Sequence, residues 1–170
     1  IGTYITMEMA NLVLPDEDYH HEVSKQLAKY IGNILTVKSH EYVALVVGLG
    51  NRDVTPDALG PRAIEGLNVT RHLVKEYGRY AMDNEKVHMI SAIAPGVMAQ
   101  TGMETYEIIK GIVDTTHPDV VFVIDALAAR NTKRLNRTRQ IPDTGIHPGS
   151  GVGNHRNEIS QETLGIPVIA

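Results

Sequence analysis

Three short apolar runs, separated by stretches of helical periodicity, constrain the fold of this 170-residue chain most strongly. They lie at 42–47 (YVALVV), 88–94 (HMISAIA) and 120–124 (VVFVI). Runs of this length are typical of strands buried on both faces of a sheet. Their alternation with helical patterns predicts an α/β fold with a mostly parallel central sheet flanked by helices. Such sheets place their sites in the loops beyond the carboxyl ends of the strands.

The helical patterns give the remaining layers of the predicted fold. Apolar residues recur at helical spacing over 16–35, where Pro15 and Asp16 supply a start. A second helix is predicted to begin near Pro61 and to run on past Leu67 and Leu73. The sequence Thr-Gly-Met-Glu at 101–104 has the spacing of a capping box, which predicts the start of a third helix there.

The C-terminal part of the chain is more irregular. A weak alternation predicts an edge strand over 136–141, and the segment 143–157 is polar and rich in glycine. A short helix is expected around 158–164, closed by Gly165, and the residues from there to Ala170 are expected to be the beginning of a strand. We therefore expect residues 1–170 to form a single α/β domain that is incomplete at both ends, a fragment of a longer chain.

Composition excludes several classes of function. The net charge of −4 and the pI near 6.1 argue against a general nucleic-acid-binding protein, which needs a surplus of lysine and arginine. There is no cysteine, so disulfides, thiolate metal sites and cysteine nucleophiles are excluded. A cytoplasmic setting fits this absence. Neither an apolar run long enough for a membrane span nor a signal peptide is visible, so no membrane partner is expected.

The stretch VVGLGNRDVTPDALGP, from Val46 to Pro61, begins like a nucleotide-binding turn. The dinucleotide fingerprint G-x-G-x-x-G nevertheless fails, because Gly50 is followed three residues later by Asp53. An aspartate at that position would repel a pyrophosphate. The chain also lacks a G-x-x-x-x-G-K-[ST] motif, so no nucleotide cofactor is expected.

Asp57 and Asp125 are the candidate catalytic residues. Asp57 follows Pro56 in a loop that Gly60 then turns into a helix, which suits a general acid or base; its alternative role is that of a turn or cap residue. Asp125 ends an apolar strand, and it either pairs with Arg130 or Arg134 or acts together with Asp57. Two close carboxylates push their pKa values apart, so that one can serve as acid and the other as base.

Other motifs are weaker. Asp143-Thr-Gly145 matches the triplet of pepsin-like proteases, but those are all-β proteins with two such triplets, and a turn is the preferred interpretation. Ser150 lacks the G-x-S-x-G frame, although His147 keeps a hydrolytic role conceivable. The histidines show no H-E-x-x-H or comparable pair, and a metal held by Asp57, Asp125 and a histidine is only weakly supported.

Three stretches resemble one family, the spore germination proteases: Val46–Leu73, Ser91–Thr105 and Val123–Ala170. The resemblance implies an endopeptidase of atypical aspartic type that begins the degradation of small acid-soluble spore proteins in the germinating spore. It further implies a zymogen, a homotetramer, a location in the cytoplasm of the forespore or spore core, and Asp57 (TPDALGP) and Asp125 (IDALAAR) as the site residues. The family chain is about twice as long as this one.

A more distant resemblance links the chain to the hydrogenase-maturation endopeptidases. It rests on a strand followed by a G-x-G-N turn, an acidic residue at the place of Asp57, and a later strand that ends in Asp125-Ala126. In that family the acidic residues bind a metal. Two mechanisms therefore remain open, a carboxylate pair that activates water and metal-assisted hydrolysis, and the metal-free pair is preferred. A non-catalytic module that binds a peptide or an anion through the glycine loops is the alternative from another functional class.

Overall fold

A computed structural model describes residues 2–37, 39, 41–79, 87–129, 131–150, 153 and 156–170. A four-stranded parallel sheet in the order β3-β2-β4-β6 forms its centre. A separate antiparallel pair, β1 and β5, lies beside it. The strands are β1 Tyr4–Glu8, β2 Val43–Gly48, β3 Met89–Ile93, β4 Val120–Ile124, β5 Thr138–Pro142 and β6 Val168–Ile169. The predicted α/β class with a parallel sheet between helices is confirmed.

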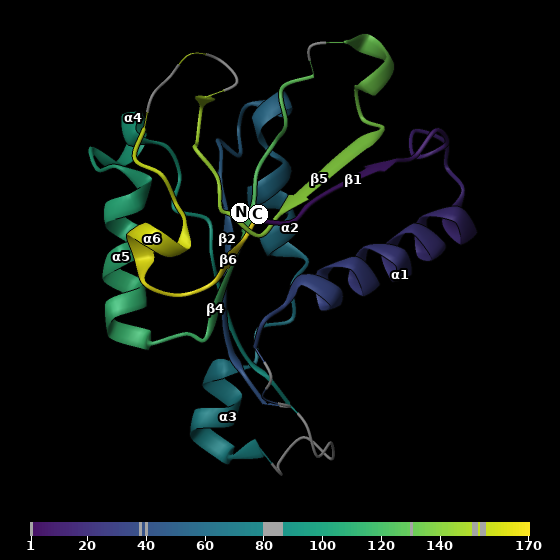
Figure 1. Cartoon of the computed structure of the whole chain (residues 1–170). Helices are drawn as coiled ribbons and strands as arrows, with labels where there is room; N and C mark the ends of the chain where they lie inside the picture. The colour runs from purple at the N-terminus through teal and green to yellow at the C-terminus, as the bar shows by residue number, and fades with distance from the viewer. Residues whose placement is uncertain are drawn as a thin grey trace.

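The helices cover the two faces of the central sheet. They are α1 Glu17–Ile34, α2 Leu59–Glu65, α3 Arg71–Tyr77, α4 Met98–Thr101, α5 Thr105–Thr116 and α6 Gln161–Leu164, with short 3-10 turns η1 Thr55–Asp57 and η3 Thr132–Arg134. Figure 1 shows α5 and α6 on one side of the sheet and α1 with the β1–β5 pair on the other. None of the helices in the described ranges is long and apolar enough to cross a membrane.

The hydrophobic core consists of two clusters, one on each face of the central sheet. Leu45 and Val47 of β2 pack with Ile109 and Val113 of α5 on one face. On the other face, Ile34 of α1 joins a cluster with β1, β5 and β6. Successive side chains of a strand point to opposite faces, so these continuous apolar runs fit strands that are covered on both sides.

The first predicted helix is confirmed almost to the residue. Asp16 is the N-cap of α1, and its Oδ1 accepts a hydrogen bond of 2.9 Å from the Tyr19 N–H. That bond satisfies one of the free amides of the first turn.

The second predicted helix is wrong in its extent, because α2 ends at Glu65 and a separate helix, α3, begins at Arg71. Thr70 explains the break. Its N–H donates to the Ile90 carbonyl at 3.0 Å and its hydroxyl accepts the Ile90 N–H at 3.0 Å, which draws the chain onto the edge of β3.

The capping box predicted at Thr101 and Glu104 is also wrong. Thr101 ends α4, Gly102 follows in the left-handed region, and Glu104 is itself the N-cap of α5. The carboxylate of Glu107 accepts the Glu104 N–H at 2.8 Å, so the box lies three residues further along the chain.

The edge strand predicted at 136–141 is present as β5, but its partner β1 was not anticipated from the sequence. The remainder of 77–86 beyond Arg79, predicted as a surface connection, lies outside the described residues. The single-domain assignment for 1–170 and the resemblance to hydrogenase-maturation endopeptidases stay predictions.

Candidate active site

Strands β2 and β4 end side by side, and the two candidate aspartates follow them. Gly48 is the register partner of Ile124, and the Leu49 N–H donates to the Ile124 carbonyl at 2.8 Å. Asp125 therefore begins the loop beyond β4 at the point where the loop beyond β2 also begins. The sequence-based expectation that both aspartates lie at one edge of the sheet is met.

The turn after β2 folds back on itself to present Asp57. Gly50 has a φ of 110°, and a Cβ atom there would lie 2.1 Å from the Asp57 carbonyl oxygen, so only glycine fits. The Asn51 N–H donates to Asp57 Oδ2 at 2.7 Å. The side chain of Asn51 in turn accepts the Asp53 N–H at 3.0 Å, which is an Asx-type turn. These bonds fix the direction of the Asp57 carboxylate.

A second close approach, between backbone atoms, packs the start of α2 against the ends of β2 and β4. A Cβ atom on Gly48 would lie 2.2 Å from the carbonyl oxygen of Gly60. A Cβ atom on Gly60 would lie 2.3 Å from the Leu49 carbonyl oxygen and 2.5 Å from that of Ile124. The glycines of the G-x-G turn and of the following LGP motif thus let backbone contact backbone, without a phosphate between them.

Asp125 lies half-buried at the end of β4, and its Oδ1 accepts the Ala126 N–H at 2.8 Å. Burial raises the pKa of Asp125, the hydrogen bond from Ala126 opposes the rise, and the charge of Asp57 adds to it. The charge of Asp57 is thus the smallest of the three effects on the pKa of Asp125, and burial is the largest. Among the described residues, no ion pair joins Asp125 to Arg134; Arg130, the other partner considered, lies outside the described residues.

The loop after β3 also reaches this edge. Gln100 Nε2 lies 3.5 Å from Asn51 Oδ1, and Gln100 Oε1 accepts the Val97 N–H at 3.4 Å. Gln100 thus links the third strand-end loop to the turn that holds Asp57. Sequence reasoning missed this residue, because a glutamine in a short helix carries no signal of its own.

The weaker candidates lie in ordinary structural roles. Asp143 Oδ1 accepts the Thr3 N–H at 2.7 Å, which ties the start of β1 to the end of β5. His147 is exposed and its Nε2 lies 3.6 Å from Glu158 Oε1. The Ser150 N–H donates to the His147 carbonyl at 3.2 Å, and the structure gives no hydrogen bond between their side chains.

The residues that could hold a metal at this edge are Asp57 and Asp125. Within the described part of the chain, no group of three or more histidine, cysteine, aspartate or glutamate residues is arranged to hold a metal ion. A catalytic zinc ion ordinarily has three protein ligands, so the described residues do not by themselves make up a site of that kind.

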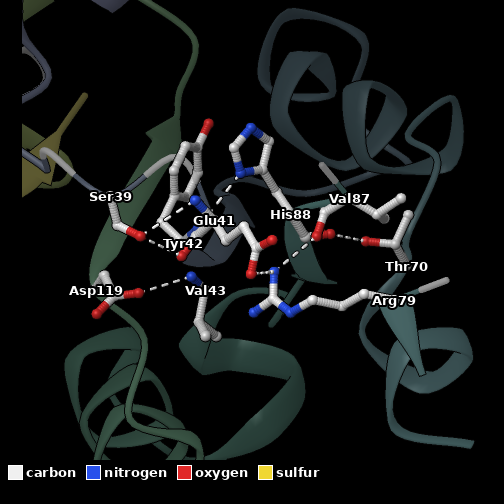
Figure 2. A network of polar contacts seen from close by, with 9 residues as sticks. All are labelled: Ser39, Glu41, Tyr42, Val43, Thr70, Arg79, Val87, His88 and Asp119. Carbon is white, nitrogen blue, oxygen red and sulfur yellow. Dashed lines mark hydrogen bonds and ion pairs between the residues drawn. The ribbon is translucent and has the colours of Figure 1, made fainter. Parts of the chain in front are cut away.

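The opposite, amino-terminal edge of the sheet carries a polar network that is shown in Figure 2. The Tyr42 and His88 rings stack with centroids 3.9 Å apart, and His88 Nδ1 accepts the Tyr42 N–H at 3.4 Å. Arg79 Nη1 donates to the Val87 carbonyl and pairs with Glu41, each at 3.0 Å. Burial and the nearby charge of Arg79 lower the pKa of His88, while Glu41 raises it. This network joins the segments that lead into β2 and β3, at the end of the sheet opposite Asp57 and Asp125.

The fold and the site together define an α/β protein with two aspartates in neighbouring loops at the carboxyl edge of a parallel sheet. The sequence profile of the germination protease family matches residues 1–170. A protein named germination protease from Caldanaerobacter subterraneus subsp. tengcongensis is 52% identical to this chain. The match covers the whole of this chain and 52% of the relative. The proteins of the same name from Bacillus cytotoxicus and Bacillus subtilis are 52% and 49% identical, over 99% of this chain and 46% of each relative.

The chain therefore belongs to the germination protease family, as its sequence motifs predicted. It spans about half the length of the curated relatives that it matches. The roles of Asp57 and Asp125 stay predictions.

Proposed function

We propose that the full-length protein is an endopeptidase that cleaves small acid-soluble spore proteins when a spore germinates, and that Asp57 and Asp125 together activate the attacking water. Membership of the germination protease family supports the activity. The observation that supports the mechanism is that Asp57 and Asp125 lie in the loops after two neighbouring parallel strands, whose ends are joined by the bond from the Leu49 N–H to the Ile124 carbonyl. Such a pair supplies one ionised and one protonated group at the same pH.

In the proposed mechanism Asp125 is the acid, because burial favours its neutral form. Asp125 Oδ1 accepts the Ala126 N–H, so the proton resides on Oδ2. Asp57 is the base. Its Oδ2 accepts the Asn51 N–H, which leaves Oδ1 to take a proton from water.

The reaction then has two steps. Asp57 Oδ1 takes a proton from water as the water oxygen bonds to the peptide carbonyl carbon, and Asp125 Oδ2 gives its proton to the carbonyl oxygen. In the second step Asp57 passes its proton to the amide nitrogen, the carbon–nitrogen bond breaks, and Asp125 recovers a proton from a hydroxyl of the tetrahedral intermediate. Both carboxyl groups end in their starting states, and the net change is the addition of one water.

Cleavage by the full-length protein tests this assignment. Asp57→Asn and Asp125→Asn should each lower kcat by at least about 1,000-fold, since removing one member of a catalytic unit disables the whole. Asp53→Asn is the matched control, because Asp53 is an exposed aspartate of the same loop. Products are followed by mass spectrometry and folding by circular dichroism. Activity within tenfold of the wild type in either folded variant would overturn the carboxylate pair.

Exhaustive chelation separates the two versions of the chemistry. The metal-free pair predicts unchanged cleavage after dialysis against a chelator. Loss of cleavage that one divalent cation restores would replace this mechanism with the metal-assisted alternative.

The assembly and cellular setting are proposed on the same family resemblance. We infer a homotetrameric zymogen in the cytoplasm of the forespore and spore core, acting on small acid-soluble spore proteins without a membrane or a direct nucleic-acid partner. Light scattering on the full-length protein tests the assembly, and any stoichiometry other than four would contradict it.

A further inference from the structure

A small pocket is lined by residues of α1, of the β1–β5 pair and of the segment between β1 and α1. Figure 1 shows α1 and the β1–β5 pair on the side of the sheet opposite α5 and α6. The volume of the pocket is about 200 Å³. Apolar side chains form most of its wall, including Met7 and Met9 from β1 and the residue beyond it, and Val23 and Leu27 from α1. A pocket of this size and composition accommodates a small apolar group.

Arg139 brings a positive charge to this apolar wall. It lies in β5 as the register partner of Met7, and its side chain is half-buried. Its Nη1 donates to the Thr138 carbonyl at 3.2 Å. None of the ion pairs between described residues includes Arg139, and burial lowers its pKa. A partly desolvated guanidinium with one neutral acceptor retains several free donors.

The other polar side chains at the pocket are His20 and Ser24, and both bond to nearby backbone. His20 Nε2 lies 3.1 Å from the Leu12 carbonyl oxygen, and the Ser24 hydroxyl donates to the His20 carbonyl at 2.8 Å. Among the polar side chains that line the pocket, the Arg139 guanidinium therefore has the most N–H groups free to donate to a ligand.

We propose that this pocket binds a small monocarboxylate with a short apolar chain, whose carboxylate pairs with Arg139 and whose hydrocarbon packs against Met7, Met9 and Leu27. A guanidinium matches a carboxylate in charge and in its planar, two-donor geometry. The apolar side chains of the lining favour an anion that carries a hydrocarbon chain over a small hydrated anion such as phosphate, which would leave them without a partner. Neither Asp57 nor Asp125 is among the residues that line this pocket.

Sodium hexanoate is the probe, titrated into the full-length protein by calorimetry and ligand-observed NMR. Saturable binding is expected. Neutral 1-hexanol should bind at least about tenfold more weakly, because hydrogen bonds to a charged group contribute about 1.5–3 kcal/mol. Acetate should also bind at least about tenfold more weakly, because each lost methylene removes about 0.8 kcal/mol of burial.

Variants locate the binding site. Arg139→Met should weaken hexanoate binding at least about tenfold, and Arg139→Lys should recover part of the affinity. Arg137→Met is the matched control, since Arg137 is exposed and lies two residues away. Asp57→Asn should bind hexanoate as the wild type does, which keeps this test separate from that of the proposed activity.

Three results would overturn the proposal: wild-type protein that shows no saturable hexanoate binding, 1-hexanol that binds as tightly as hexanoate, or folded Arg139→Met that binds within twofold of the wild type. Thermal unfolding of each variant establishes that it is folded.

Discussion

Gly48 and Gly60 pack backbone against backbone, so closely that a Cβ atom on Gly48 would lie 2.2 Å from the carbonyl oxygen of Gly60. This contact joins the last residue of β2 to the first turn of α2. The chain between them includes Asp57, whose carboxylate is held by the Asn51 N–H. The glycine contact thus holds together the two ends of the loop that carries the candidate base.

Gly60→Ala should therefore destabilise the protein by about 1–3 kcal/mol or more, because the new methyl group meets backbone that cannot move aside easily. Denaturant unfolding of the full-length protein measures the change. Gly111→Ala is the control. A Cβ atom on Gly111, within α5, meets nothing within 4 Å, so alanine there should be neutral or stabilising by about 0.5–1 kcal/mol. Equal stability of Gly60→Ala and the wild type would contradict the packing.

Asp125 should contribute to function at the expense of stability. Its pKa is raised in the folded state, chiefly by burial. The folded protein then binds the proton more tightly than the unfolded chain does, so stability is greatest below the ordinary carboxyl pKa and falls as the pH rises through the folded-state value.

Asp125→Asn removes this penalty and should raise the Tm by a few degrees at neutral pH, with little change at pH 3. Differential scanning calorimetry at the two pH values measures the effect. Asp114→Asn is the comparison, because Asp114 pairs with Lys110 on the exposed side of α5 and should not gain stability. A lower Tm for Asp125→Asn at neutral pH would show that the charge stabilises the fold.

His88 should make the amino-terminal edge of the sheet sensitive to acid (Figure 2). Its pKa is lowered in the folded state by burial and by the charge of Arg79, against the opposite effect of Glu41. Protonation of Nδ1 would also remove the acceptor for the Tyr42 N–H. The stability that neutral His88 contributes to the folded protein is therefore fully present above the unfolded-state pKa near 6.5. This stability is lost as the pH falls below about 6.5 toward the folded-state pKa.

His88→Phe keeps a ring to stack on Tyr42 but cannot titrate. The free energy of unfolding should therefore fall less steeply between pH 6.5 and 5 in this variant than in the wild type, whatever its stability at neutral pH. His72→Phe on α3 serves as the control. Identical slopes for His88→Phe and the wild type would contradict the role of His88.

The parallel sheet could be predicted from the sequence because each of its three main strands is a continuous apolar run that can be recognised without knowing its partners. The runs that became β2 and β4 are mostly buried on both faces and that of β3 is partly buried throughout, so their apolar composition alone marks them. β1 could not be found in this way, because its pairing with β5 joins residues that are 130 or more positions apart and neither strand is uniformly buried. The division of the second helix also depends on a distant partner, the bond between Thr70 and Ile90.

The candidate site followed from the same logic, but only in part. Strand-end position singled out Asp57 and Asp125, and parallel strands bring their carboxyl ends to one edge. The effect of the Asp57 charge on the pKa of Asp125 and the hydrogen bond from Asn51 depend on how tightly the loops close, which a sequence pattern does not encode. The roles of Gln100 and Arg139 likewise depend on neighbours that are distant in sequence, Asn51 for Gln100 and Met7 for Arg139.

The most direct test of the proposed catalytic pair is kcat/KM of the full-length Asp57→Asn/Asp125→Asn double variant, measured beside both single variants on a small acid-soluble spore protein. If the two carboxylates act as one unit, the double variant should lose no more activity than the more impaired single variant. If the losses multiply instead, Asp57 and Asp125 act independently, and the shared activation of water is contradicted.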